Sequence, residues 1–209
     1  MTATRILIAD DQDDVRSGFR LILDSQPDMT VVAEAADGAA AVDLARTLRP
    51  DIVLADIRMP KRDGLEVTRL LSAETKVIVV TTFDLDDYVH TALRHGACGF
   101  LLKRSGPALL IEAVRAAMAG DTLISPQITV RLLRHLAPEP GRTRPRDPLT
   151  PREREIARLV AQGLTNAEIA AELVVTPGTV KTHLANVQTK LEVRNRVGIA
   201  AWAWRSGLA

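Results

Sequence analysis

The sequence predicts an α/β doubly wound domain with a five-stranded parallel sheet, followed by a small all-α domain of four helices. In the first part of the chain, short β-rich apolar runs alternate with segments whose apolar residues recur at helical spacing. Residues 137–151 then hold five of the eleven prolines, which favours a linker over a helix or a central strand. After this segment, helical patterns continue and no strand pattern appears.

The five expected strands are short, and each is followed by a segment with helical spacing of its apolar residues. Their sequences are RILIA, VVAEA, DIVLA, KVIVV and CGFLL, at residues 5–9, 31–35, 51–55, 76–80 and 98–102. Five consecutive strand–helix units predict parallel pairing with right-handed crossovers. We therefore expect helices on both faces of this sheet.

The patterns divide the chain into two domains and a connection. We assign residues 1–121 to the first domain, 122–148 to a connecting helix (roughly 125–136) with the proline-rich linker, and 149–209 to the second domain. In the second domain we expect helices at 151–162, 166–173, 177–191 and 195–206. Thr150, Pro151 and Glu153 are typical of a helix start with a capping box.

Composition and charge indicate two modules of a soluble protein. The net charge of +1 conceals 16 basic against 19 acidic residues in 1–135, and 8 against 5 in 150–209. This asymmetry suggests different partners for the two domains. No apolar run reaches the roughly 18 residues of a membrane span. The single cysteine, Cys98, allows no internal disulfide and fits a cytoplasmic protein, with Cys98 as a small core residue.

Polar residues stand at the carboxyl ends of four expected strands. Asp10 and Asp11 follow the first strand, Asp56 the third, Thr81 the fourth and Lys103 the fifth. These ends meet at one edge of a parallel sheet, where ligands bind in open α/β folds. Carboxylates suit Mg²⁺, while a lysine and a hydroxyl can stabilise phosphoryl oxygens. The set predicts phosphoryl transfer to an aspartate, although each residue alone could serve as a cap or a solvated side chain.

Residues 5–119 resemble a response-regulator receiver domain. The resemblance lies in DD at 10–11, DIRMP at 56–60 with Gly64 following, TT at 81–82 and GFLLK at 99–103. Arg104 stands where many receivers have a proline after the lysine.

The resemblance implies a role for each matching position. Asp56 would be the phosphoacceptor, and Mg²⁺ would be held by Asp10, Asp11, Asp56 and the backbone carbonyl of Arg58. Lys103 would contact the phosphoryl group, and Thr81 and Phe100 would form a switch pair. An aromatic residue on a strand is otherwise core packing, so the switch role of Phe100 rests on the resemblance.

Residues 164–191 carry a helix-turn-helix pattern, with a short helix, a tight turn and a longer second helix. Apolar residues give both helices a buried face, and Lys181, Thr182 and Ala185 lie on or near the opposite face of the second. Such a helix fits the major groove of DNA, although helix pairs that contact no DNA share the pattern.

The wider segment, residues 149–209, resembles the LuxR-type helix-turn-helix domain, and the whole chain resembles a NarL/FixJ-class response regulator. The resemblance implies that Lys181, Thr182 and Ala185 read bases. It places Thr179, His183, Lys190 and Arg194 near phosphates, although Thr179 could instead cap the helix. Ala185 cannot donate the bidentate bond that a polar side chain would provide.

We therefore expect a DNA-binding transcription regulator of a two-component system, a phosphoprotein modified on Asp56 by a sensor histidine kinase. Phosphorylation would control dimerisation or release of the DNA-binding domain, and a homodimer would bind DNA. The alternative is a DNA-binding regulator whose receiver acts independently of phosphorylation. A hydrolase is disfavoured because Arg58, not an acid, stands two residues after the nucleophile. We expect that the protein is not an enzyme and that it does not bind a membrane.

Overall fold

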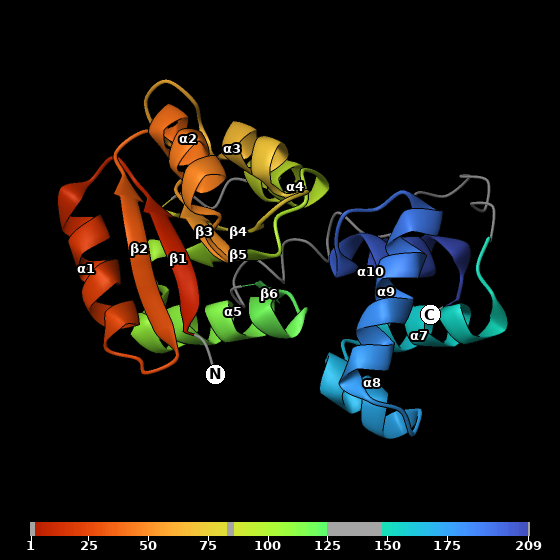
Figure 1. Ribbon diagram of the computed structural model, residues 1–209. Coiled ribbons are helices and arrows are strands. Elements are labelled where there is room, and N and C mark those ends of the chain that lie inside the picture. Colours follow the sequence, from red (N-terminus) through yellow and green to blue (C-terminus); the bar gives the residue numbers. More distant parts are fainter. Residues whose placement is uncertain (1–2, 83–85, 125–147, 209) are drawn as a thin grey trace.

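The computed structural model describes residues 3–82, 86–124 and 148–208, which form an α/β domain and an all-α domain side by side (Figure 1). The expected connecting helix and most of the expected linker lie outside the described residues.

The sheet of the N-terminal domain is parallel throughout, in the order β2-β1-β3-β4-β5-β6. Its strands are β1 (Thr4–Ala9), β2 (Met29–Ala35), β3 (Ile52–Ala55), β4 (Lys76–Thr81), β5 (Gly99–Leu102) and β6 (Leu123–Ile124). The five expected strands are confirmed within two residues at each end. β6 was not expected, because two residues are too short to show a pattern and pair only with the edge of β5.

Helices cover both faces of the sheet, as predicted (Figure 1). They are α1 (Asp13–Asp24) and α5 (Pro107–Ala119) on one face, and α2 (Gly38–Leu48), α3 (Gly64–Leu71) and α4 (Asp86–Arg94) on the other. Alternate residues of each strand enter opposite cores: Ile6 and Ile8 face α1 and α5, while Leu7 and Ala9 face α2 and α3. Because helices cover both faces of the sheet, both sets of residues are apolar, and each strand reads as a continuous apolar run.

The strand order reverses at β1, because β2 lies on one side of β1 and β3 lies on the other. In doubly wound sheets, this switch point opens a crevice at the carboxyl ends of the two strands that flank it. Asp10 and Asp11 follow β1, and Asp56 follows β3, so the topology brings the expected acids to that crevice.

The C-terminal domain consists, over residues 148–208, of the four expected helices. These are α7 (Pro151–Ala161), α8 (Asn166–Glu172), α9 (Pro177–Leu191) and α10 (Arg196–Ser206). The expected capping box of Thr150 and Glu153 is present, and Thr165 and Glu168 form a second one at α8. The helices enclose one core that includes Ile156, Val180 and Trp202. No helix in the described part of the chain is long and apolar enough to span a membrane.

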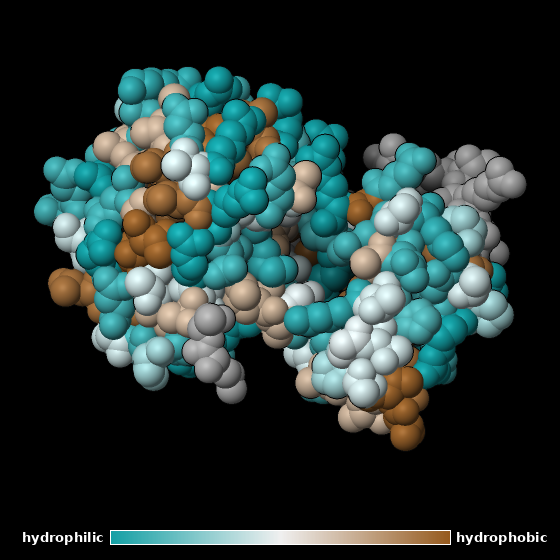
Figure 2. Space-filling view, viewed as in Figure 1, coloured by the Kyte–Doolittle hydropathy of each residue, from teal (hydrophilic) through white to brown (hydrophobic). Residues whose placement is uncertain are grey.

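The domains contact each other through α10. Val197, in the first turn of α10, packs against an N-terminal cluster that includes Val89, Leu93 and Phe100. An open cleft of about 740 Å³ also lies between the domains, and its lining includes Lys76 of the N-terminal domain and Asn195 of the C-terminal domain. Figure 2 shows the two lobes and the largely hydrophilic surface that each presents on the visible face.

Candidate functional sites

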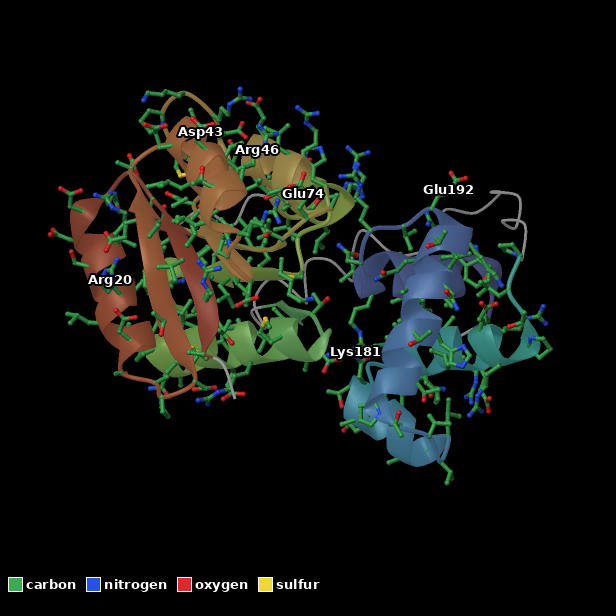
Figure 3. All side chains as sticks on the ribbon, in the orientation of Figure 1. Arg20, Asp43, Arg46, Glu74, Lys181 and Glu192 are labelled. Carbon is green, nitrogen blue, oxygen red and sulfur yellow. The ribbon has the colours of Figure 1, made fainter. Side chains whose placement is uncertain are left out.

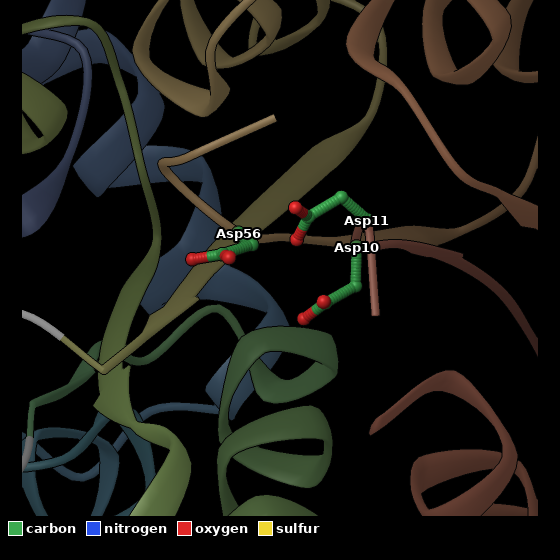
Figure 4. Close-up of side chains that lie close together, drawn as sticks. All are labelled: Asp10, Asp11 and Asp56. Carbon is green, nitrogen blue, oxygen red and sulfur yellow. The ribbon is translucent and has the colours of Figure 1, made fainter. Parts of the chain in front are cut away.

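The acid pocket, which we define as Asp10, Asp11, Asp56 and Lys103, lies at the carboxyl edge of the sheet. The three aspartates offer ligand oxygens within 4.8 Å of one another (Figure 4). Asp10 and Asp56 are buried, whereas Asp11 is exposed. Oxygen ligands of Mg²⁺ stand at most about 4 Å apart across the ion, so a small inward movement would suit this donor set. The pocket therefore fits a hard divalent cation.

Lys103 joins the two buried acids of the pocket. Its Nζ lies 2.6 Å from Oδ2 of Asp10 and 2.9 Å from Oδ2 of Asp56. Burial alone would lower the pKa of Lys103, but the hydrogen bonds and charges of both acids outweigh it and raise that pKa. Burial raises the pKa of Asp10, although Lys103 opposes this effect. The lysine therefore stays a cation between the two buried acids.

Main-chain bonds fix the position of the acids. The amide of Asp56 donates to the carbonyl of Ala9 over 2.8 Å, and the amide of Asp10 donates to that of Ala35 over 3.0 Å. The amide of Ile57 donates to Oδ1 of Asp56 over 2.7 Å, which leaves Oδ2 toward Lys103. The sheet thus holds the acid pocket before any ligand arrives.

Gly64 lies against the main chain of Asp56. A Cβ added at Gly64 would stand 2.0 Å from the carbonyl oxygen of Asp56, a distance that real Cβ atoms do not show. The amide of Gly64 also donates to the carbonyl of Ile57 over 2.9 Å. The glycine of the sequence pattern is therefore required for α3 to begin so close to the pocket.

Three further residues were expected to act together with the pocket. Thr81 is buried at the end of β4, and the side chain of Arg58 is exposed. Phe100 is buried in the cluster that also contains Val89 and Leu93 of α4. The proposed carbonyl contact of Arg58 and the coupled movement of Thr81 and Phe100 remain predictions.

α8 and α9 form the expected helix-turn-helix. Lys181, Thr182 and Ala185 are exposed on α9, and His183 is half-buried. Thr179 is exposed too. It does not cap α9, because the cap is Thr176, whose Oγ1 accepts from the amide of Thr179 over 3.1 Å. The side chains expected to read bases are therefore on the surface of the domain.

Two residues expected near phosphates bind protein groups in this structure. Lys190 donates to Oε2 of Glu153 over 2.6 Å and so joins α9 to α7. Burial alone would raise the pKa of Glu153, but Lys190 and Thr150 together lower it to about 2. Arg194 donates to the carbonyl of His95 in the N-terminal domain over 3.1 Å. DNA contact by either residue stays a prediction.

Asn195 binds both domains at once. Its Oδ1 accepts from the amide of Gly198 and caps α10, over 3.0 Å. Its Nδ2 donates to the carbonyls of Leu93 and Ala97, at the end of α4, over 2.7 and 2.9 Å. No local pattern in the sequence pointed to the contacts of Asn195 with the other domain, since Leu93 and Ala97 are about a hundred residues away.

A second set of contacts joins α8, α9 and α10 to the end of α5. Asp121 accepts from the amide of Asn166 over 3.0 Å and forms an ion pair with Arg196. Lys181 donates to the carbonyl of Met118 over 3.2 Å, on the side of α9 that faces α5 (Figure 3). One of the expected base-reading side chains is thus engaged by the N-terminal domain.

Comparison with known proteins agrees with this two-domain reading. Residues 6–115 match the family described as response regulator receiver domain, and residues 147–203 match the bacterial regulatory proteins of the luxR family.

Similar proteins match along nearly the whole chain. The transcriptional regulatory protein LiaR of Bacillus subtilis (strain 168) is 40% identical over 98% of both chains. The nitrate/nitrite response regulator protein NarL of Escherichia coli (strain K12) is 38% identical over 94% of this chain and 93% of its own.

Two solved structures are similar to nearly the whole chain. The response regulator ChrA of a heme-sensing two component system is 36% identical, covers 100% of both chains and has a TM-score of 0.55. A structure of two RcsB dimers bound to two parallel DNAs is 25% identical, with a TM-score of 0.58, over 96% of this chain and 98% of that one.

Proposed function

The chain belongs to the response regulators that join a receiver domain to a LuxR-type DNA-binding domain, and we propose that phosphorylation of Asp56 controls its binding to DNA. The acid pocket is the observation that carries this proposal. It holds a buried candidate nucleophile with two further acids whose oxygens lie within 4.8 Å, and a buried cation that contacts two of the three acids. Because every member is present, a receiver that works without phosphorylation is not favoured.

The chemistry follows from the residues of the pocket. An oxygen of Asp56 forms a bond to phosphorus while the bond from phosphorus to the imidazole nitrogen of a sensor histidine kinase breaks. The electron pair of that bond returns to the imidazole. Lys103, whose Nζ lies 2.9 Å from Oδ2 of Asp56, stabilises the negative charge on the phosphoryl oxygens.

Mg²⁺ is the cation that we propose for the pocket. Asp10, Asp11, Asp56 and the carbonyl of Arg58 would hold it, and when bound it would neutralise charge on the phosphoryl group. The oxygen-only donor set supports this choice over a softer metal. The chain would use this chemistry for regulation, not for turnover of a substrate, which agrees with relatives described as transcriptional regulators.

Residues 1–121 would form the receiver domain and residues 149–209 the DNA-binding domain, and residues 122–148 would connect the two. DNA is the proposed partner of the second domain. Lys181, Thr182 and Ala185 would read bases, while Thr179, His183, Lys190 and Arg194 would lie near phosphates. The RcsB structure described as dimers on DNA supports a homodimer as the bound form. A cytoplasmic location follows for a protein that binds DNA.

The contacts between the domains support a switch in which the DNA-binding domain is released from the receiver domain. Lys181 cannot enter a major groove while its ammonium is bound to Met118 at the end of α5. Val197 packs on the cluster that contains Phe100, so a movement of the switch pair would alter the surface on which α10 rests. Phosphorylation would then separate the domains and permit assembly on DNA.

Sedimentation with Mg²⁺ tests the proposal, with and without beryllofluoride, which mimics a phosphoryl group. We expect beryllofluoride to convert the wild-type protein to dimers and to leave Asp56→Asn unchanged. Radiolabelled acetyl phosphate should label the wild-type protein only. Equal labelling of both proteins would show that Asp56 is not the phosphoacceptor. Labelling without any change in assembly or DNA affinity would refute control by phosphorylation.

A further inference from the structure

Asp121 places a carboxylate among cationic and N–H donors of the DNA-binding domain. Its Oδ1 accepts from the main-chain amide of Asn166 and from the guanidinium of Arg196. Both charged side chains are largely buried, with 14% of Asp121 and 11% of Arg196 exposed. The carboxylate thus fills an anion site built from groups of the other domain.

Asp121 compensates part of the cost of burying the positive charge of Arg196. Burial lowers the pKa of Arg196, and the charge and hydrogen bond of Asp121 are the largest influences that oppose this. Arg196 also donates to the carbonyl of Leu164 and contacts Oδ1 of Asn166, so its guanidinium is held in place from within its own domain. When the domains separate, this oriented guanidinium loses Asp121 and can accept another anion.

The site lies on the same surface as the expected base-reading side chains. Gly120, which has φ of +86° and ends α5, fits closely against this surface. A Cβ added there would stand 3.1 Å from Nδ2 of Asn166 and 3.4 Å from Cε of Lys181. Asn166 and Lys181 are therefore neighbours, and Arg196 lies beside Asn166. The end of α5 covers all three.

In a helix-turn-helix, the second helix enters the major groove while the first crosses the DNA backbone. Arginine side chains and main-chain N–H groups are common donors to the phosphates along that path. Arg196 and the amide of Asn166 lie beside the helix that carries Lys181, and they already hold an oxyanion. A phosphate carries the same kind of oxygen acceptor as a carboxylate and binds arginine in the same way.

We propose that Arg196 and the main-chain amide of Asn166, which lie next to the base-reading Lys181, bind a phosphate of the DNA backbone, and that Asp121 occupies this site while the domains are packed together. The inference rests on the proposed function and extends it, since neither Arg196 nor Asn166 was expected at the DNA. Docking and DNA binding then compete for the same donors. Loss of Asp121 frees the site, whereas loss of Arg196 weakens both docking and DNA binding.

The test uses the full chain and a fluorescent DNA duplex of arbitrary sequence, because phosphate contacts do not depend on sequence. Anisotropy gives the dissociation constant at salt concentrations from roughly 50 to 200 mM. Asp121→Ala should bind about tenfold more tightly than the wild-type protein, because the site is uncovered. In that background, Arg196→Gln should lose roughly tenfold in affinity and lower the salt slope by about one.

Two further variants in the Asp121→Ala background separate a phosphate contact from other effects. Arg205→Gln removes an exposed arginine from the same helix and should leave the salt slope unchanged. Arg196→Lys keeps the charge and should retain the slope, even where Arg196→Gln reduces the thermal stability of the domain. An unchanged affinity and slope for Asp121→Ala/Arg196→Gln would overturn the inference and leave Arg196 as a docking residue. Absence of DNA binding by every variant would instead refute the proposed function.

Discussion

The side-chain amide of Asn195 lies 2.7 Å from the carbonyl oxygen of Leu93, across the boundary between the two domains. The same amide donates to the carbonyl of Ala97, while its oxygen caps α10. Leu93 belongs to the cluster that contains Phe100, so Asn195 attaches the first turn of α10 to the part of the receiver that the proposed switch would move. One buried side chain therefore serves local helix formation and domain packing together.

Asn195→Asp should separate these two roles. Aspartate caps a helix about as well as asparagine, but its second oxygen would face the carbonyls of Leu93 and Ala97 without a proton to donate. We expect the domains to separate while α10 stays folded, at a cost to docking of about 2–4 kcal/mol. Small-angle scattering should show a larger radius of gyration than that of the wild-type protein.

Asn195→Ser is the matched control for this variant. Serine keeps the cap and introduces no charge, so its effect on the radius of gyration should be smaller than that of aspartate. A compact Asn195→Asp protein with a normal far-ultraviolet spectrum would contradict the role of this side chain in docking.

Lys103→Met should raise the affinity of the acid pocket for divalent cations while it slows phosphorylation. The ammonium of Lys103 contacts two of the proposed metal ligands, so its loss removes a competing positive charge. A gain of about tenfold corresponds to roughly 1.4 kcal/mol, a moderate value for a charge at this distance. Electron paramagnetic resonance of free Mn²⁺ measures the affinity, and acetyl phosphate labelling measures the phosphorylation rate.

Lys61→Met provides the comparison for this experiment. Lys61 forms an ion pair with Asp37 over 2.7 Å, outside the acid pocket, and its side chain is well exposed. The variant Lys61→Met should change neither the affinity for Mn²⁺ nor the rate of labelling by acetyl phosphate. Weaker Mn²⁺ binding by Lys103→Met would show that the lysine organises the acids more than it repels the cation.

The local patterns of the sequence were sufficient to predict the strands β1 to β5, the four helices of the second domain and the edge of the sheet at which the acids meet. Strand ends in a parallel sheet share one edge, so Asp10 and Asp56 could be placed together from their positions alone. The contacts of Lys190, Asn195 and Asp121 could not be placed in this way. Each depends on how helices or domains pack, which no periodicity within one segment records.

Val174→Asn should stabilise the DNA-binding domain. Val174 follows α8 with a φ of +53°, a left-handed conformation that is unfavourable for a β-branched residue, and its side chain is 90% exposed. Figure 2 shows hydrophobic atoms at this end of the domain. Asparagine tolerates the conformation, so we expect a gain of about 1 kcal/mol in the free energy of unfolding.

Calorimetry of the full chain measures this gain as a rise of roughly 4–8 °C in the transition of the DNA-binding domain. Val174→Ala removes the β-branch but keeps a Cβ in the left-handed region, so it should give a smaller rise. If asparagine gives no rise, the left-handed conformation of Val174 costs the domain no measurable stability, and the prediction is wrong.

Glu153→Gln should remove a pH dependence of the stability of the DNA-binding domain. Lys190 and Thr150 hold the pKa of Glu153 at about 2 in the folded protein, below its ordinary value of 4.5. Between these two values the unfolded chain binds more protons than the folded one, so stability falls as the pH falls. The contribution of the pair is therefore present above about pH 4.5 and lost as the pH drops through about 2.

Thermal unfolding at a series of pH values between these limits tests this assignment. Glutamine keeps the shape of the side chain but not its charge, so its transition should lie lower at neutral pH and fall less steeply with acid. Glu155→Gln, which removes a partner of Arg152 in a more exposed ion pair, should keep the wild-type slope. If Glu153→Gln keeps that slope too, Lys190 is not bound to Glu153 in solution, and its side chain is available for the phosphate contact that the sequence predicts.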